Sequence, residues 1–275
     1  MHVRTLTVTF DLPLRYQEID KWRGAFVELT GGDLPIFHNH KDNLPNRYIK
    51  EYSRIQYRST GRRAAIFAIN EGIDALQDIL ERPDLQIYWY DQPTDIRIHS
   101  LNMEGHYLQM TATPQHYRLR RWLPFNQHNY PEWCQAKNLR QRIRLLEKIL
   151  TGHILGACQG CDYHIPERLR VELQRINRTT NITYKDVGMV ALDIEYTANI
   201  LLPQGIGIGK STALGFGCQN NIRPRYPQAL PENDIQVTTY WRVASYGLRV
   251  AGFRVGSKRV TKKMTNILVH YIHIL

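Results

Sequence analysis

The chain opens on two clear hydrophobic patterns. Apolar residues alternate with threonine over residues 5–10, which predicts a half-buried strand. Apolar residues then recur every three or four positions over residues 19–29, which predicts a helix. The pair Gly31 and Gly32 follows, and glycine is typical of a helix end.

A pair of strands and a second helix follow a polar loop. Residues 54–59 and 64–69 are predicted to form two short strands joined by turn residues at Thr60 and Gly61. Asn70 is a predicted cap of the next helix, which must end before Pro83. Further strands are expected over residues 85–113.

The same order of elements returns in the second part of the chain. A strand is predicted over residues 117–125, and a single long helix from Pro131 to Leu150. Residues 169–174 and 190–199 then alternate like strands, with a turn at 186–188. Two successive sets of this kind predict an α+β fold of two tandem ferredoxin-like (RRM-like) halves. Each antiparallel sheet is expected to have helices on one face and to keep the other face free for single-stranded RNA.

The domain boundaries follow from this repeat and from a change of composition near its end. We predict an N-terminal half at 1–113, a C-terminal half at 114–217 and a basic extension at 218–275. The extension contains nine Lys or Arg residues against two acidic residues, a net +7 of the chain's total of +11. It is interpreted as an RNA-holding extension, a partner-docking segment or poorly ordered sequence.

Composition narrows the class of partner. The 275 residues are 43% hydrophobic, enough for two cores, and the pI is near 9.5. A net charge of +11 favours a polyanion such as nucleic acid. There is no apolar run of membrane-spanning length and no signal-peptide pattern, so we expect a soluble, cytoplasmic protein without a membrane partner. Four cysteines in a chain of this length do not make a disulfide framework.

The segment PQGIGIGKSTALGFG contains Gly-Lys-Ser, which is also found in nucleotide-binding P-loops. A P-loop requires a glycine five residues before the glycine of that triplet, because this loop length curls the amides around a phosphate. Gln204 stands there, and Gly205 comes one residue too late. An ATP-binding reading is therefore not supported.

The segment instead contains two Gly-apolar-Gly groups separated by five residues, at 207–209 and 215–217. Glycines without a Cβ allow the backbone to bend sharply and to approach phosphates, with charge and donors from Lys210 and Ser211. Ile208 and Phe216 are expected to anchor the ends of the loop in the core. A tight turn without any ligand is the simpler alternative. The predicted RNA-binding residues, including two arginines of the 117–125 strand, are Gly207, Gly209, Lys210, Ser211, Gly215, Gly217, Arg120 and Arg121.

This motif at the end of a second ferredoxin-like half resembles the RAMP superfamily of CRISPR-associated proteins, and within it the repeat-processing endoribonucleases of the sixth Cas family. The resemblance extends from about Val3 to Gly217 and includes the phrases WRGAFVELTGG, FHNHKDN, IQYRS, AAIFAINEG and HILGA. Members of that family generally end soon after the second Gly-x-Gly group. The residues from 218 onward therefore depart from its pattern.

Candidate catalytic residues lie just beyond the first predicted helix, in Phe37-His38-Asn39-His40-Lys41. An extended backbone would direct His38 and His40 to the same side, where they could act as base and acid, while Lys41 stabilises phosphate charge. The resemblance implies a histidine in this loop that acts in cleavage and faces the glycine-rich loop. His40 is favoured over His38. Exposed histidines that bind phosphate, or nothing, are the alternative.

Cys158 and Cys161 lie between His153 and His164, which places four potential zinc ligands within twelve residues. Structural zinc sites generally separate their two ligand pairs by a longer excursion, so we interpret this segment as a helix end with incidental thiols. No metal and no cofactor is expected.

These features together predict an endoribonuclease that binds the repeat of CRISPR precursor RNA. The resemblance implies metal-independent 2′-hydroxyl attack, leaving a 2′,3′-cyclic phosphate and a 5′-hydroxyl. The alternative is a noncatalytic RAMP subunit that holds guide RNA in an effector complex. Repeat RNA is the expected partner, and other CRISPR effector proteins or a second copy of the chain are further candidates.

Overall fold

A computed structural model describes residues 1–31, 34–38, 52–184 and 187–222, with His38 and Tyr184 described by their backbone alone. These residues fall within one compact unit, Met1–Arg223. Among them, no helix is long and apolar enough to cross a membrane.

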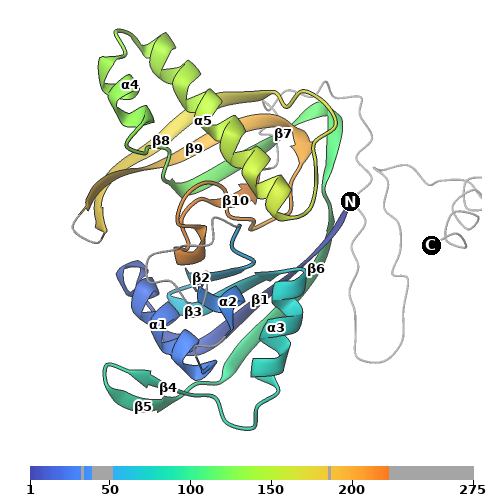
Figure 1. The fold of residues 1–275 in the computed structure, drawn as a ribbon, viewed down its shortest axis with the longest axis vertical. Helices are drawn as coiled ribbons and strands as arrows, with labels where there is room; N and C mark the ends of the chain where they lie inside the picture. The colour runs from blue at the N-terminus through green and yellow to red at the C-terminus, as the bar shows by residue number, and fades with distance from the viewer. Residues whose placement is uncertain (32–33, 39–51, 185–186, 223–275) are drawn as a thin grey trace, which may run out of the picture. The chain divides into compact units, whose positions relative to one another are not determined.

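The first half contains an antiparallel sheet in the order β2-β3-β1-β6. Helices α1 and α3 lie on its outer face (Figure 1). This arrangement is the ferredoxin-like order, in which the first and third strands are neighbours at the centre. The elements are β1 (His2–Pro13), η1 (Tyr16–Glu18), α1 (Ile19–Leu29), α2 (Pro35–His38), β2 (Ile55–Thr60), β3 (Arg63–Ile69), α3 (Glu71–Leu80) and β6 (Ile98–Tyr107).

The alternation at the start of the chain decides which face of β1 is covered. Phe10 points to the helical side and packs against Trp22 of α1 at a ring-centroid distance of 5.3 Å. The threonines point to the opposite side, where Thr7 lines a cleft. Helix α1 ends as predicted, because Gly31 adopts φ +85°, a conformation that costs glycine little. Gly32 lies outside the described residues.

Between α3 and β6 the chain forms a small hairpin, β4 (Gln86–Trp89) and β5 (Gln92–Asp95). Tyr90 and Asp91 at its turn both have positive φ. Ile87 points into the first core. The strands expected over 85–113 are therefore β4, β5, β6 and the beginning of the next strand, β7 (Gln109–Trp122).

The second half repeats the strand order as β10-β7-β9-β8. Its elements are β7, α4 (Asn129–Gln135), α5 (Leu139–Gly160), β8 (Val171–Tyr184), β9 (Val187–Leu201), η2 (Thr212–Leu214) and β10 (Cys218–Asn221). The glycine-rich segment and its single 3-10 turn η2 occupy the connection that a second crossover helix fills in the first half. The tandem ferredoxin-like prediction is confirmed. Cys218–Asn221, at the start of the expected extension, form the edge strand β10.

The single helix predicted from Pro131 to Leu150 is wrong, because the chain forms two helices there. Ala136 has an extended conformation, ψ 117°, and ends α4. Asn138 begins α5, and its Oδ1 accepts a hydrogen bond from the backbone N of Gln141 at 3.0 Å. An asparagine that can cap a new helix competes with continuation of the old one.

Asn70 stands at the N-cap position of α3 as predicted, but its side chain does not cap the helix. Its Oδ1 accepts instead from the backbone N of Arg4, at 3.0 Å, and its own N donates to the Arg4 carbonyl. Asn70 therefore joins the start of α3 to β1. The tertiary partner replaces the local one because φ +46° turns the residue away from the usual cap geometry.

The inner face of the first sheet is only partly free, contrary to the expectation for single-stranded RNA. Val3, Phe67 and Ile69 are almost fully buried and belong to the core of the second half. Figure 1 shows the reason: the glycine-rich segment lies between the two sheets, beside the edge strand β10, with the helices on the outer sides. Apolar burial along this seam makes the two halves one body.

Candidate functional site

The uncovered parts of the two inner sheet faces border a cleft of about 1450 Å³. Strands β1, β2 and β6 line it from one side, and β7, β8 and β9 from the other. Its lining includes five arginines against three acidic residues, which favours an anionic ligand. These residues are Arg58, Arg118, Arg120, Arg121, Arg178, Asp20, Glu104 and Asp193.

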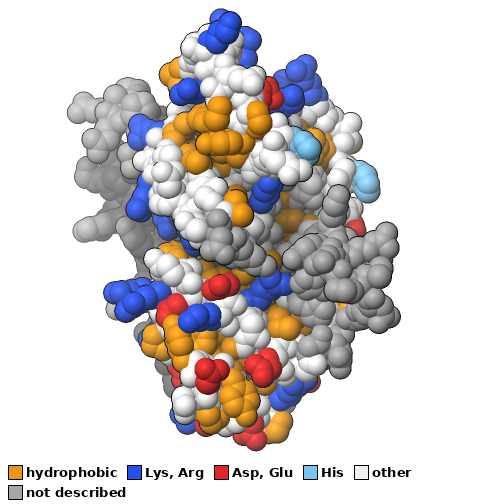
Figure 2. Space-filling model, turned by 60° about the vertical axis from the view of Figure 1, so that its left-hand side comes forward, with side chains coloured by type: hydrophobic (Ala, Val, Ile, Leu, Met, Phe, Trp, Pro, Cys, Tyr) orange, Lys and Arg blue, Asp and Glu red, His pale blue; other side chains and the backbone are white. Residues whose placement is uncertain are grey.

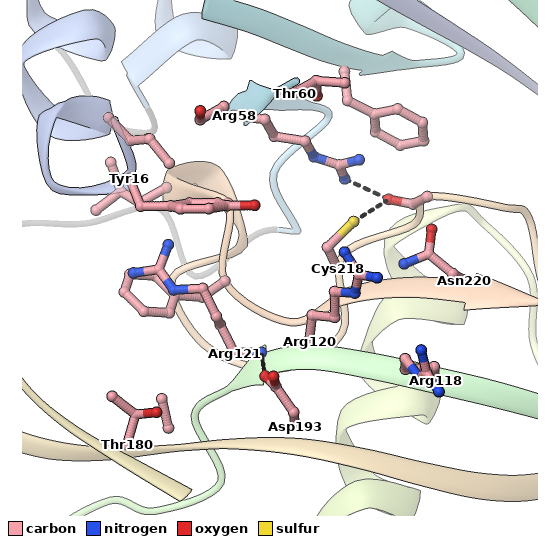
Figure 3. Close-up of a pocket in the computed structure, with 18 of the residues that line it drawn as sticks. Tyr16, Arg58, Thr60, Arg118, Arg120, Arg121, Thr180, Asp193, Cys218 and Asn220 are labelled. Atoms are coloured by element: carbon pink, nitrogen blue, oxygen red, sulfur yellow. Dashed lines mark hydrogen bonds between the residues drawn. The ribbon is translucent and has the colours of Figure 1, made fainter. Parts of the chain in front are cut away.

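Arg121 stands at a bulge in β7, with φ +51° and a register shift around it. Its backbone N donates to Asp193 Oδ1 at 2.7 Å, and its carbonyl accepts from the N of Gly217 at 3.2 Å. Its guanidinium lies over the rings of Tyr16, at 4.8 Å, and Phe216, at 4.3 Å (Figure 3). The bulge therefore turns Arg121 toward η1 and the glycine-rich segment, and its burial lowers the pKa of the guanidinium.

The other cleft arginines differ in how much of their charge is available. Arg118 donates to Glu195 at 2.6 Å, and this hydrogen bond lowers the pKa of that carboxyl. Arg58 donates to the Gly205 carbonyl and lies over the ring of Phe67 at 4.0 Å. Arg120 is exposed, and its side chain makes no hydrogen bond or ion pair with any residue described. Of the two arginines singled out from the sequence, Arg120 is thus the one with a free head group.

The charge is unevenly distributed over the surface. Figure 2 shows Lys and Arg side chains in both halves, whereas Asp and Glu gather mostly over the lower, first half. The exposed face of α5 contributes basic side chains in the second half, at Arg140, Arg142, Arg144 and Lys148, and Lys137 lies just before this helix.

The glycine-rich segment is held by a short backbone ladder. The N of Ile208 donates to the Gly217 carbonyl at 2.7 Å, and the N of Gln219 donates to the Ile206 carbonyl at 3.0 Å. Ile208 and Phe216 are buried, so the predicted anchoring of the loop ends is confirmed. The segment between them projects as a closed loop with η2 at its far end.

Each glycine of the motif faces protein atoms. A Cβ on Gly217 would lie 1.9 Å from the Ile208 carbonyl oxygen, and one on Gly207 would lie 2.7 Å from Gln56 Oε1. Gly207 and Gly217 are themselves buried, whereas Gly209 and Gly215 are half-buried. Gly207 and Gly215 therefore allow the loop to pack closely against the first half, and Gly209 and Gly217 allow close packing within the second half. The accessible part of the loop is its middle.

Lys210 and Ser211 occupy that accessible middle and are both half-buried. Lys210 Nζ donates to the Phe125 carbonyl at 2.9 Å, and burial lowers the pKa of its ammonium group. Ser211 has φ +54° and precedes η2. Both residues bring polar groups to the loop surface that faces α5, where His153 lies.

The candidate catalytic segment begins at a residue buried in the first half. Phe37 of α2 is buried in the first core, and its carbonyl accepts from the hydroxyl of Tyr57 at 3.3 Å. His38 is the last residue of α2, while His40 and Lys41 lie outside the described residues. Further along the chain, the hydroxyl of Tyr52 donates to the Gly207 carbonyl at 2.7 Å.

Cys158 and Cys161 lie at the end of α5, as predicted, with both thiols in the core of the second half. Burial raises the pKa of each thiol to about 12. His164 is exposed and His153 is bonded to Trp122. Among the residues described, no group of three or more His, Cys, Asp or Glu could hold a metal ion.

Sequence reasoning missed four contributors to this region: Tyr16, Arg58, Trp122 and His153. Arg58 stands within IQYRS, one of the phrases behind the family resemblance, so its motif membership was a usable signal. His153 likewise stands within HILGA, another of those phrases, whereas Tyr16 and Trp122 are brought in by tertiary contacts that no local pattern indicates.

Two antiparallel sheets in the ferredoxin order, with a glycine-rich segment between them, define a tandem ferredoxin-like fold. Residues 1–107 match the family described as the Cas6b N-terminal domain, and residues 109–222 match the Cas6b C-terminal domain. The chain belongs to the Cas6b family. The family resemblance seen in the sequence is thereby confirmed, and the chain is of the CRISPR repeat-processing Cas6 type.

Solved structures share this fold. One described as "Crystal structure of Cas6b" is 24% identical with a TM-score of 0.70, over 81% of this chain and 100% of that one. Another, "Crystal structure of CRISPR RNA processing endoribonuclease Cas6b", is 20% identical with a TM-score of 0.61 over the same shares.

A relative of unassigned function also matches. The uncharacterized protein MJ0978 of Methanocaldococcus jannaschii is 31% identical over 96 residues. The match spans 35% of this chain and 64% of that protein, less than two thirds of its length.

Proposed function

We propose that this protein cuts CRISPR precursor RNA at the repeat, without a metal, by attack of a 2′-hydroxyl on the adjacent phosphate. The observation that carries the proposal is the hydrogen bond from Tyr52 to the Gly207 carbonyl. It joins the first half of the chain to the glycine-rich loop, although the two bonded residues are 155 positions apart. Family membership and the arginine-lined cleft support an RNA substrate.

The reaction requires a base, an acid and charge stabilisation. One histidine of the pair His38 and His40 takes the proton of the 2′-hydroxyl as its oxygen bonds to phosphorus. The bond from phosphorus to the 5′-oxygen then breaks, and the other histidine protonates that oxygen. Lys41 stabilises the phosphorane. The products are a 2′,3′-cyclic phosphate and a 5′-hydroxyl.

RNA binding is assigned to the basic cleft and to the accessible part of the glycine-rich segment. Arg120 offers a free guanidinium, and Arg121 lies beside it on β7. Lys210 and Ser211, flanked by Gly209 and Gly215, form the accessible part of the loop. Buried Gly207 and Gly217 hold the loop in shape, so their part in RNA binding is indirect. The list of contacts is thus Gly209, Lys210, Ser211, Gly215, Arg120 and Arg121.

The test is to incubate the purified chain with end-labelled repeat RNA from its own locus, with and without EDTA, and to map the product ends. Cleavage with a cyclic phosphate terminus in EDTA, abolished by the His38→Ala/His40→Ala double change, is expected. Tight binding with intact RNA would support the noncatalytic subunit instead. Cleavage that EDTA abolishes, or that survives the double change, contradicts the mechanism.

A further inference from the structure

A second, smaller pocket lies between α5 and the glycine-rich segment. It has a volume of about 310 Å³ and shares no lining residue with the central cleft. Gly152 and Gly156 open it from α5, because a Cβ at either position would meet nothing within 4 Å. Its lining residues include no acidic group and are Tyr52, Ser53, Gly152, His153, Gly156, Ala157, Gly209, Ser211, Thr212 and Ala213.

The tautomer of His153 in this pocket is set by a buried tryptophan. Trp122 Nε1 donates to His153 Nδ1 at 3.0 Å, and the rings meet edge to face at 87°. An indole nitrogen is a donor only, so Nδ1 must be an acceptor. The neutral imidazole therefore carries its hydrogen on Nε2, which makes no hydrogen bond to any residue in the described part of the chain. Burial, with a smaller contribution from Lys210, lowers the pKa of His153 to about 4, so the ring is neutral at pH 7.

The loop side of the pocket supplies further donors. The backbone N–H groups of Gly209 and Ser211 donate to no acceptor within the described ranges. Both residues have positive φ, +102° and +54°, so the chain turns sharply here, and backbone amides in turns can line a concave anion site. The ammonium group of Lys210 lies close enough to His153 to lower its pKa. Free donors, a nearby cation and no carboxylate favour an anion in this pocket.

We propose that this pocket binds one phosphate of the RNA backbone, with the Nε2–H of His153 and the amides of Gly209 and Ser211 as donors. The inference rests on the proposed function, since it takes repeat RNA as the ligand. It adds a phosphate subsite on α5, outside the arginine-lined cleft and outside the histidine segment.

The same hydrogen bond excludes His153 as a general base. Nε2 already carries a hydrogen, and protonation at Nδ1 would set two donors, His153 and Trp122, against each other. His153 is therefore a binding residue, and its removal weakens RNA binding without abolishing the chemical step.

The test asks which single phosphate of the RNA interacts with His153. Repeat RNA is made with one neutral methylphosphonate at a time, with a 2′-O-methyl ribose on its 5′ side to keep it intact. The same RNA with an ordinary phosphate is the reference. Affinity is measured for the wild-type chain and for His153→Leu. A hydrogen bond to a charged group predicts a loss of about tenfold at one phosphate in the wild type. His153→Leu is expected to lose about as much affinity for unmodified RNA and to be insensitive to that methylphosphonate.

Two variants control for folding and for general loss of positive or polar surface. His153→Gln keeps an amide donor for the phosphate and a carbonyl acceptor for Trp122, so its affinity should stay within about threefold of wild type. His164→Leu removes an exposed histidine that lines neither pocket and should change nothing. If His153→Leu does not fold, ¹⁵N spectra of the histidine-labelled wild-type protein test whether His153 contacts RNA. RNA should shift the Nε2–H resonance of His153 while Nδ1 stays unprotonated.

Failures of the two proposals are distinguishable. A wild-type chain that neither binds nor cuts repeat RNA contradicts the proposed function. A chain that binds and cuts it, but gives the same methylphosphonate profile with His153→Leu, or shows no RNA-dependent shift at His153, contradicts the phosphate subsite alone.

Discussion

Tyr52 donates a hydrogen bond to the carbonyl oxygen of Gly207 at 2.7 Å, across the seam between the two halves of the chain. The hydroxyl also accepts from Gln56 Nε2 at 3.0 Å, so one side chain serves the first sheet and the glycine-rich segment together. Burial raises the pKa of this phenol far above its usual range, which keeps it neutral and able to donate. The relationship makes the position of the glycine-rich loop dependent on the first half.

We expect Tyr52→Phe to lower the free energy of unfolding by about 1–3 kcal/mol, because the Gly207 carbonyl and the Gln56 amide both lose a partner. Urea denaturation followed by tryptophan fluorescence measures this. Tyr88→Phe is the matched control, since Tyr88 is 57% exposed. Equal midpoints for the two variants would contradict the role assigned to Tyr52.

The second prediction concerns the end of the glycine motif. Gly217→Ala places a Cβ 1.9 Å from the Ile208 carbonyl oxygen at a residue with φ +64°. We expect a loss of about 3 kcal/mol or more, or failure to fold, because both backbone strain and overlap oppose it. Gly24→Ala in α1 is the control, since nothing lies within 4 Å of its Cβ and alanine favours helix. Thermal denaturation compares the two, and a small effect at Gly217 would show that the loop relaxes.

The third prediction separates two neighbouring arginines. Arg120→Ala should leave the melting temperature unchanged while weakening RNA binding, because the Arg120 guanidinium is exposed and makes no ion pair among the described residues. It should also reduce the slope of log affinity against log salt by about 0.7, the value for one contact to a single strand. Arg121→Ala should lower the melting temperature, since its guanidinium packs between Tyr16 and Phe216. An unchanged salt slope in Arg120→Ala would remove that residue from the RNA contacts.

The fourth prediction concerns pH. Burial, and to a lesser extent Lys210, holds the pKa of His153 at about 4, below the 6.5 of an ordinary histidine. Between these values the unfolded chain binds a proton that the folded chain does not, so stability falls as pH decreases through this window. We expect His153 to contribute a loss of about 1 kcal/mol between pH 7 and pH 5, after allowance for its partial exposure. Urea denaturation should show that the free energy of unfolding changes less between pH 7 and pH 5 in His153→Gln than in the wild type, because glutamine does not titrate. An identical difference in both proteins would contradict the assignment.

Local patterns were sufficient wherever a residue's neighbours in sequence decide its environment. The alternation over residues 5–10 predicted both β1 and its covered face, because strand geometry sends successive side chains to opposite sides. The pattern failed at Ala136, where the apolar spacing continues but Asn138 caps a new helix. It failed again at Asn70, whose side chain bonds Arg4 of a neighbouring strand.

Some features of the candidate site were likewise predictable from the sequence, and others arise only in the folded chain. Spacing identified the two Gly-x-Gly groups and excluded a P-loop. Side-chain chemistry and the family resemblance singled out His38, His40 and Lys41 as catalytic candidates. The packing that buries Gly207 and Gly217, the bulge that turns Arg121 onto Phe216 and the bond that fixes the tautomer of His153 arise only in the folded chain. These contacts join residues far apart in sequence, and their free energy depends on distance and burial, which no local pattern encodes.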